Sequence, residues 1–565
     1  MLNTKLRGIA IRPFFLWGLW TLLTGISVHA SPVEAPHPVY GFLRRLEVRG
    51  ILERPFLGSL PFQSDEVLAL LRSAAADSAK LGAWERRELT RYLAEFDPEL
   101  HRQSSRLVYS DSGRSLSGSV KYYAAGQYRD SLPGADASLF TAFSPHVEGR
   151  LSPNLSFVSE ATVGSEKDGR NRYLINYDPQ RGLPYNTRKR DSLTDLDNAT
   201  TFDAFRTVMS WHAQGFGIDI GDDWNQWGPG VWQHPTFGTH PWFWVNDSLP
   251  TADSARFGGS YLPGGSRSGF RYPGESAPLT QLRIDFTWHA FKYTKFIAER
   301  TGLDDKDQAY VTAHRLEVRI GRNLLVGAHE LVAFAGRSFE PIYAIPLVPL
   351  KFAEHQVGDK DNTALGLDMD YRLPRGMRVY GELFLDDLLG PAEILGSYWG
   401  NKYATVLGWE VYDLLLPSSC LQIEYARVEP WLFGHHHYDD QLQHYGSLLG
   451  SSIPPDSHAA WVHWSKSLPA GLSADLEYAF LQRALHVRGS SIFDFHENSL
   501  DGTTKVFLGG DPETRNAVRA GLSGRYGRYV LAKVALGYLR VDTWKGNPGT
   551  DLSGPSASGE VLLTY

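Results

Sequence analysis

The chain has 565 residues, a formal net charge of −7 and one cysteine, Cys420. The slightly acidic balance gives no indication of nucleic-acid binding, and a single cysteine excludes an internal disulfide. Aromatic residues make up 13% of the chain, with 16 Trp and 27 Tyr, side chains that favour membrane interfaces.

Residues 1–30 predict a secretory signal peptide. Lys5, Arg7 and Arg12 precede an apolar run over 14–26, and Val28-His29-Ala30 offers small residues to a signal peptidase. A transmembrane anchor is the alternative, but the run is shorter than the roughly 20 apolar residues that a spanning helix needs. The pattern therefore favours export and cleavage.

Residues 31–105 are expected to form a small helical periplasmic segment. Apolar residues recur at helical spacing in VYGFLRRLEVRGIL, Ser64 is a candidate N-cap for a second helix, and a third helix over 84–96 should stop before Pro98. Three short helices bury only a small core alone, so we expect them to pack on the mouth of something larger.

Residues 106–565 predict an all-β transmembrane barrel. Short segments alternate between apolar and polar side chains, and Gly, Asn, Asp and Pro clusters separate them. The stretch 363–373 has one apolar face and one face with two aspartates, which would be costly in a dry core. An antiparallel barrel with lipid outside and water inside satisfies both faces. A soluble sandwich or propeller with one solvated face is the alternative.

The barrel is expected to have about 16 to 18 strands, an even number. One strand is predicted over 203–221, and the terminal aromatic Tyr565 resembles the end of outer-membrane barrels. Long polar insertions at 165–200, 430–457 and 485–513 should be external loops. The predicted lumen is polar, with these side chains pointing inward: Arg315, Glu317, Arg319, Asp368, Asp370, Arg372, Arg378 and Glu382.

The densest aromatic cluster is GDDWNQWGPGVW at 221–232. Gly228-Pro229-Gly230 breaks a strand, so this stretch should leave the wall and fold inward or cap the lumen. Indoles beside carboxylates and amides suit sugars, and a guanidinium suits an acidic sugar. The alternative is that the indoles pack the turn or form an interfacial girdle. The predicted glycan-binding residues are Asp222, Asp223, Trp224, Asn225, Trp227 and Arg256.

Two further stretches carry side chains that can ligate metal ions. Asp359-Lys360-Asp361-Asn362 offers the oxygen ligands that calcium prefers, but without the spacing of an EF-hand, which favours a solvated turn. His435-His436-His437 cannot easily direct three rings at one ion, which favours an exposed loop tip. No catalytic or cofactor motif is present, so we expect no enzyme, no metal and no cofactor; a hydrolase on the barrel wall is the least favoured alternative.

Several stretches resemble the capsule assembly Wzi family: HRLEVRIGRNLLVGAHELVAFAGR, IYAIPLVPLKFAEHQ, DNTALGLDMDYR, VYGELFLDD and DWNQWGPG. The resemblance runs over most of residues 38–565. It implies an outer-membrane barrel of about 18 strands in a Gram-negative bacterium, acting as a lectin that holds capsular polysaccharide on the cell surface. The implied partners are surface polysaccharide and outer-membrane lipid. The longer loops at 165–200 and 485–513 depart from the family and leave the polymer open, and a diffusion or uptake porin is the alternative function.

Overall fold

The computed structural model describes residues 31–97, 107–111, 114–129, 137–168, 199–239, 278–301, 308–386, 396–414, 416–436, 440–444, 447–492, 494–527 and 529–564. The predicted signal peptide, most of the predicted loop 165–200, Arg256 and Tyr565 lie outside these ranges. Within the described ranges, no helix is both long enough and apolar enough to cross a bilayer.

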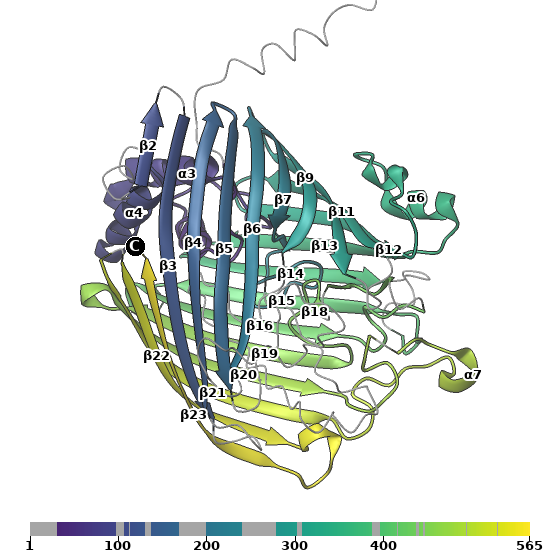
Figure 1. The fold of residues 1–565 in the computed structure, drawn as a ribbon. Coiled ribbons are helices and arrows are strands. Elements are labelled where there is room, and N and C mark those ends of the chain that lie inside the picture. The colour runs from purple at the N-terminus through teal and green to yellow at the C-terminus, as the bar shows by residue number, and fades with distance from the viewer. Residues whose placement is uncertain are drawn as a thin grey trace, which may run out of the picture.

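Eighteen antiparallel strands close into one barrel, as predicted, and β23 completes the ring by pairing with β3 (Figure 1). The short strand β2 (Leu107–Asp111) extends the edge of β3. In ring order the strands are β3 (Arg114–Arg129), β4 (Ala137–Ser152), β5 (Leu155–Asp168), β6 (Ala199–Ala213), β7 (Phe216–Asp223), β9 (Leu279–Trp288), β10 (Phe291–Thr301), β11 (Gln308–Ile320), β12 (Leu324–Ala335), β13 (Asn362–Leu373), β14 (Met377–Asp386), β15 (Tyr403–Tyr412), β16 (Ser419–Val428), β19 (Ser457–Ser467), β20 (Leu472–Arg483), β21 (Glu513–Tyr526), β22 (Val530–Asp542) and β23 (Leu552–Thr564).

The single strand predicted over 203–221 is two strands, β6 and β7. Gln214 and Gly215 both adopt positive φ, +49° and +81°, and reverse the chain between them. Two-residue turns of this kind join neighbouring antiparallel strands because their twist matches that of the strands. The sequence pattern did not reveal this turn because apolar and polar residues keep alternating across it.

The N-terminal helices α2 (Val39–Val48), α3 (Ser64–Ala76) and α4 (Ala83–Phe96) lie at the end of the barrel that carries the short turns (Figure 1). We call this the helix end. The opposite end, which carries the long connections with α6 (Leu350–Val357) and α7 (Asn498–Asp501), we call the loop end. The third helix ends before Pro98, as predicted. The N-cap of α3 is Gln63 and not Ser64, whose hydroxyl instead accepts a hydrogen bond from the Ser31 amide at 3.2 Å.

Along the strands of the wall, apolar side chains point outward and charged side chains point into the lumen, as the alternation predicts. Leu316, Leu367 and Met369 are exposed on the outer face. All eight charged residues predicted to point inward do so. Arg315 pairs with Asp368 at 2.5 Å and Arg378 pairs with Asp370 at 2.5 Å, whereas Arg319 and Arg372 donate to backbone oxygens of the N-terminal segment.

The prediction of a polar lumen is correct only for the helix-end half. In the loop-end half, wall residues such as Phe296, Phe384 and Trp461 form one apolar core with side chains from the connections. The stretch 430–457, predicted as an external polar loop, leaves β16 at the loop end but packs Leu432, Leu442 and other apolar side chains into this core. The apolar residues inside that connection, rather than its overall polarity, decided its position.

Candidate functional site

The aromatic stretch after β7 folds into the lumen, as predicted. Its two-residue strand β8 (Gln226–Trp227) pairs with β1 (Ser59–Leu60) of the N-terminal segment, with Ser59 opposite Trp227. The Gly228 amide adds a hydrogen bond of 3.0 Å to the Gly58 carbonyl. A segment from the helix end and a segment from the loop end therefore meet inside the barrel, and together we call residues 54–63 and 224–239 the plug.

One buried carboxylate holds the turn of the plug. Glu424, on β16, accepts backbone hydrogen bonds from Val231 at 2.6 Å, Trp232 at 3.1 Å and Gln233 at 2.7 Å. The Tyr380 hydroxyl donates a fourth bond at 2.7 Å. An ionised carboxylate that accepts several N–H groups makes strong hydrogen bonds, so Glu424 fixes the plug to the wall.

The conformation of the plug requires glycine at residue 228. Gly228 has φ +93°, and a Cβ atom built on it would collide with the Glu382 carboxylate of β14. Only glycine adopts this φ without penalty and leaves room for the carboxylate.

The two tryptophans of the predicted site are buried. Trp227 has 0% exposure and contacts the rings of Phe237, Phe296 and His329 at centroid distances of 5.0, 5.4 and 5.8 Å. Trp224 has 3% exposure and packs in the core of the N-terminal helices. Neither indole presents a face to a ligand in this structure. Their role in glycan binding stays a prediction, and the burial favours the alternative interpretation in which they pack the turn.

The polar residues of the predicted site that the structure describes, Asp222, Asp223 and Asn225, do not form one cluster. Asp222 and Asp223 are neighbours on β7 and point to opposite sides of the wall. Asp222 accepts from Thr280 at 2.5 Å on the exposed side, whereas buried Asp223 accepts two bonds from Arg206, at 2.8 and 3.1 Å. Asn225 accepts from Arg283 at 3.1 Å.

Asp223 and Asn225 act through these arginines on the N-terminal segment. Arg206 also donates to the Pro32 carbonyl at 2.8 Å, and Arg283 donates to the Leu60 carbonyl at 3.0 Å. Asp223 and Asn225, which were predicted to bind a ligand, therefore help to hold the plug in place through these hydrogen bonds.

Ion pairs seat the helices on the turns of the barrel. Arg45 of α2 pairs with Glu85 of α4 at 2.7 Å and with Asp413, in the turn after β15, at 2.7 Å, and it donates to the Ser419 carbonyl at 3.0 Å. Burial alone would raise the pKa of Glu85, but hydrogen bonds from Arg49 and Arg45 outweigh it and hold this pKa below its usual value. The helices and the barrel are therefore joined by buried charge.

A cavity of about 350 Å³ separates α2 and the plug from the wall of β15, β16 and β19. Arg44, Trp232, Glu410, Gln422 and His463 line it. Sequence reasoning missed this cavity because its lining comes from three parts of the chain that no motif connects.

An aromatic and charged cluster lies on the connections of the loop end. The rings of Trp399 and His496 stack at 3.6 Å with an angle of 2°, and Trp431 meets His496 edge-on at 5.3 Å. Arg488 is exposed and donates two hydrogen bonds to Asp501, at 2.5 and 2.9 Å. We call these five residues the loop-end cluster. Sequence reasoning missed it because it assembles from three separate connections.

The backbone fixes two of these connections to each other. Tyr398 and Thr504 form an isolated β-bridge, and the Trp399 amide donates to the Thr503 carbonyl at 3.2 Å. Trp399 and His496 are both half-buried, so part of each ring faces solvent.

In the stretch 359–362, the first two residues are exposed and the last two are buried. Asp359 and Lys360 are exposed, as a solvated turn predicts. Asp361 and Asn362 are buried, contrary to that expectation: Asp361 accepts from Arg337 and Tyr343, each at 2.5 Å, and Asn362 begins β13.

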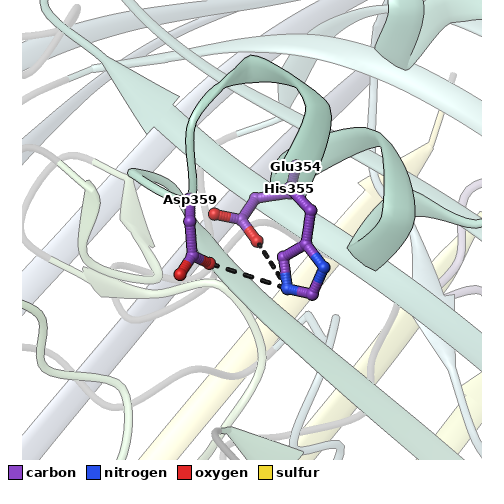
Figure 2. Close-up of side chains that lie close together, drawn as sticks. All are labelled: Glu354, His355 and Asp359. Carbon is purple, nitrogen blue, oxygen red and sulfur yellow. Dashed lines mark ion pairs between the residues drawn. The ribbon is translucent and has the colours of Figure 1, made fainter.

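Glu354, His355 and Asp359 converge on one another (Figure 2). His355 Nε2 lies 3.9 Å from Glu354 and 3.7 Å from Asp359. The Lys351 ammonium is already 3.0 Å from Glu354 and 3.6 Å from Asp359, and it supplies the positive charge that a metal ion would bring.

The histidine run was predicted to be an exposed loop tip. His436 is exposed, whereas His435 is half-buried and lies 3.9 Å from Asp440; His437 is outside the described residues.

Comparison with known proteins gives a structural likeness only. No protein-family model matches the sequence, and no curated protein matches it. The chain superposes on Wzi, an outer-membrane protein of Escherichia coli described as involved in group 1 capsule assembly and as a carbohydrate-binding β-barrel, with a TM-score of 0.56, 13% identity and coverage of 95% of this chain and 100% of that chain. OprD of Pseudomonas aeruginosa matches at a TM-score of 0.42 with 10% identity over 82% of this chain and 96% of that chain, too weakly to carry an argument. The chain therefore has the fold of an outer-membrane β-barrel similar to that of Wzi.

Proposed function

We propose that this chain is an outer-membrane barrel that binds surface polysaccharide at its loop end and helps to retain it on the cell. The observation that carries the proposal is the plug. Two chain segments hydrogen-bond to each other inside the barrel; the first bonds to charged side chains of the wall, and the second packs into the apolar core. A barrel closed in this way serves as a rigid platform for its surface connections better than as a channel.

The loop-end cluster has the chemistry that a polymer of sugars requires. Half-buried Trp399 and His496 offer flat rings, and aromatic rings stack on the apolar faces of sugars at little cost in side-chain entropy. Arg488 and Asp501 offer directed hydrogen bonds, and a guanidinium pairs bidentately with a uronate carboxylate. Repeated weak contacts along a polymer add up through avidity.

The residues predicted from the sequence enter this proposal in two ways. Asp222, on the exposed side of β7, and Arg256, outside the described residues, stay candidates for direct contact with the glycan. Asp223, Trp224, Asn225 and Trp227 support the platform because they hold and fill the plug.

The proposal is tested by replacing Trp399 and Arg488 with alanine in a strain whose own copy is deleted. Each variant is expected to insert as a heat-modifiable barrel while more polysaccharide is shed and less stays cell-bound. Trp288→Ala, an exposed indole at the helix end, is the matched control and should retain polymer as the parent does. Normal retention by both loop-end variants would contradict the proposed site.

Direct binding and conductance separate this function from the porin alternative. The purified barrel is expected to bind isolated surface polysaccharide in solution, and Trp399→Ala to weaken that binding. In planar bilayers the parent protein should show little steady conductance. A large stable conductance together with no polysaccharide binding would instead support a porin.

A further inference from the structure

The connection between β12 and β13 folds back onto the outside of the barrel. It contains a short 3-10 turn, η3 (Pro341–Ala344), and α6 (Leu350–Val357), which projects beside β12 at the loop end (Figure 1). Val332 and Phe334 of β12 point outward, yet both have 0% exposure because Tyr343, Leu350 and other side chains of this connection cover them. We call residues 337–361 the outer-wall segment.

The outer-wall segment covers polar groups that stand on the outer face of the wall. Lys295 donates to the Ile345 carbonyl at 3.1 Å, and Glu330 accepts from the Leu350 amide at 2.6 Å. His314 lies 3.1 Å from the same Glu330 oxygen. Such groups would be costly against hydrocarbon without partners, so the segment satisfies them at the edge of the lipid-facing band.

On its other side the segment exposes three large apolar side chains, whereas its exposed charged residues Asp359 and Lys360 follow α6 in the turn that leads to β13. Ile345 has 51% exposure, Leu347 has 73% and Phe352 has 66%. The adjacent strand β13 exposes Leu365 and Leu367 on the same outer face, which belongs to the lipid-facing band of the barrel. The three side chains of the segment therefore continue an apolar surface that lipid already covers.

We propose that the outer-wall segment lies in the interfacial region of the membrane, with Ile345, Leu347 and Phe352 inserted among the acyl chains of the leaflet at the loop end. Segments with one apolar face and one polar, protein-bound face partition to this depth. The segment thereby extends the apolar band of the wall on the side of β10 to β13, and it sets how deeply the barrel sits on that side. This inference concerns the lipid side of the wall and does not rest on polysaccharide binding.

Site-directed fluorescence measures the depth of the segment. Single cysteines are introduced as Leu347→Cys and Phe352→Cys in a Cys420→Ser background, labelled with an environment-sensitive fluorophore and reconstituted in liposomes. A second set keeps Cys420, which is buried and serves to show that the background substitution is harmless. Quenching is compared between lipids with a nitroxide near the headgroup, lipids with a nitroxide near the chain end, and aqueous iodide.

Two control positions calibrate the result. Leu367→Cys lies within the lipid-facing band, and Val506→Cys lies at an exposed position of the connection between β20 and β21. Labels at 347 and 352 are expected to be quenched by the headgroup-level nitroxide and to be protected from iodide. The label at 367 should also be protected from iodide, whereas the label at 506 should be quenched by it. The proposal would be overturned by iodide quenching at 347 and 352 equal to that at 506, or by the absence of quenching by both nitroxide lipids.

Discussion

Replacing Glu424 with alanine should release the plug without unfolding the barrel. The change removes the common acceptor of three backbone amides, those of Val231, Trp232 and Gln233. The Gln233 amide is buried and losing its acceptor costs about 1–3 kcal/mol, whereas Val231 and Trp232 are half-buried and each lost bond costs about 0.5–1.5 kcal/mol, so the change removes about 2–6 kcal/mol of docking energy. Removing a buried carboxylate also relieves its own desolvation, which favours the lower end of this range.

A loss of about 3 kcal/mol raises the open population of the plug roughly 100-fold, at tenfold per 1.4 kcal/mol. Hydrogen exchange of residues 224–239 should accelerate by that factor, and brief channel openings should appear in planar bilayers. Glu53→Ala, at an exposed position of the N-terminal segment, is the matched control and should change neither. Unchanged exchange and no openings, in a variant that still forms a heat-modifiable barrel, would refute the role assigned to Glu424.

Three further outcomes are expected. Trp227→Ala should lower the free energy of unfolding by about 3–5 kcal/mol because it empties a fully buried site, whereas half-buried Trp399→Ala should lower it far less; thermal melting in detergent micelles compares them. Arg45→Ala should weaken the attachment of the helices by about 1–3 kcal/mol, because Glu85 and Asp413 then keep only Arg49 as an ion-pair partner, and limited proteolysis should release the helices sooner. Burial raises the pKa of Asp456 to about 7, above its unfolded value, so its contribution to stability is complete at low pH and is lost as pH rises through 7. Thermal melting should therefore occur at a lower temperature at pH 8 than at pH 5, and Asp456→Asn should reduce that difference.

The sequence by itself determined the wall of this protein. In a strand, successive side chains point to opposite sides, so the alternation around Arg315, Asp368 and Arg378 established which residues face the lumen before any contact was known. The strand-breaking Gly228-Pro229-Gly230 likewise predicted that the chain leaves the wall at that point. Both signals are local, since each depends only on neighbours along the chain.

Only the tertiary structure decided what each connection does. Trp227 and Trp399 are the same residue type in comparable polar surroundings of the sequence, yet the first is buried because β1 pairs beside it and the second is half-exposed on a surface connection. The loop-end cluster joins residues from three connections, and the outer-wall segment hides Phe334 on a face that alternation assigns to lipid. These outcomes depend on contacts between distant parts of the chain, which period and composition do not encode.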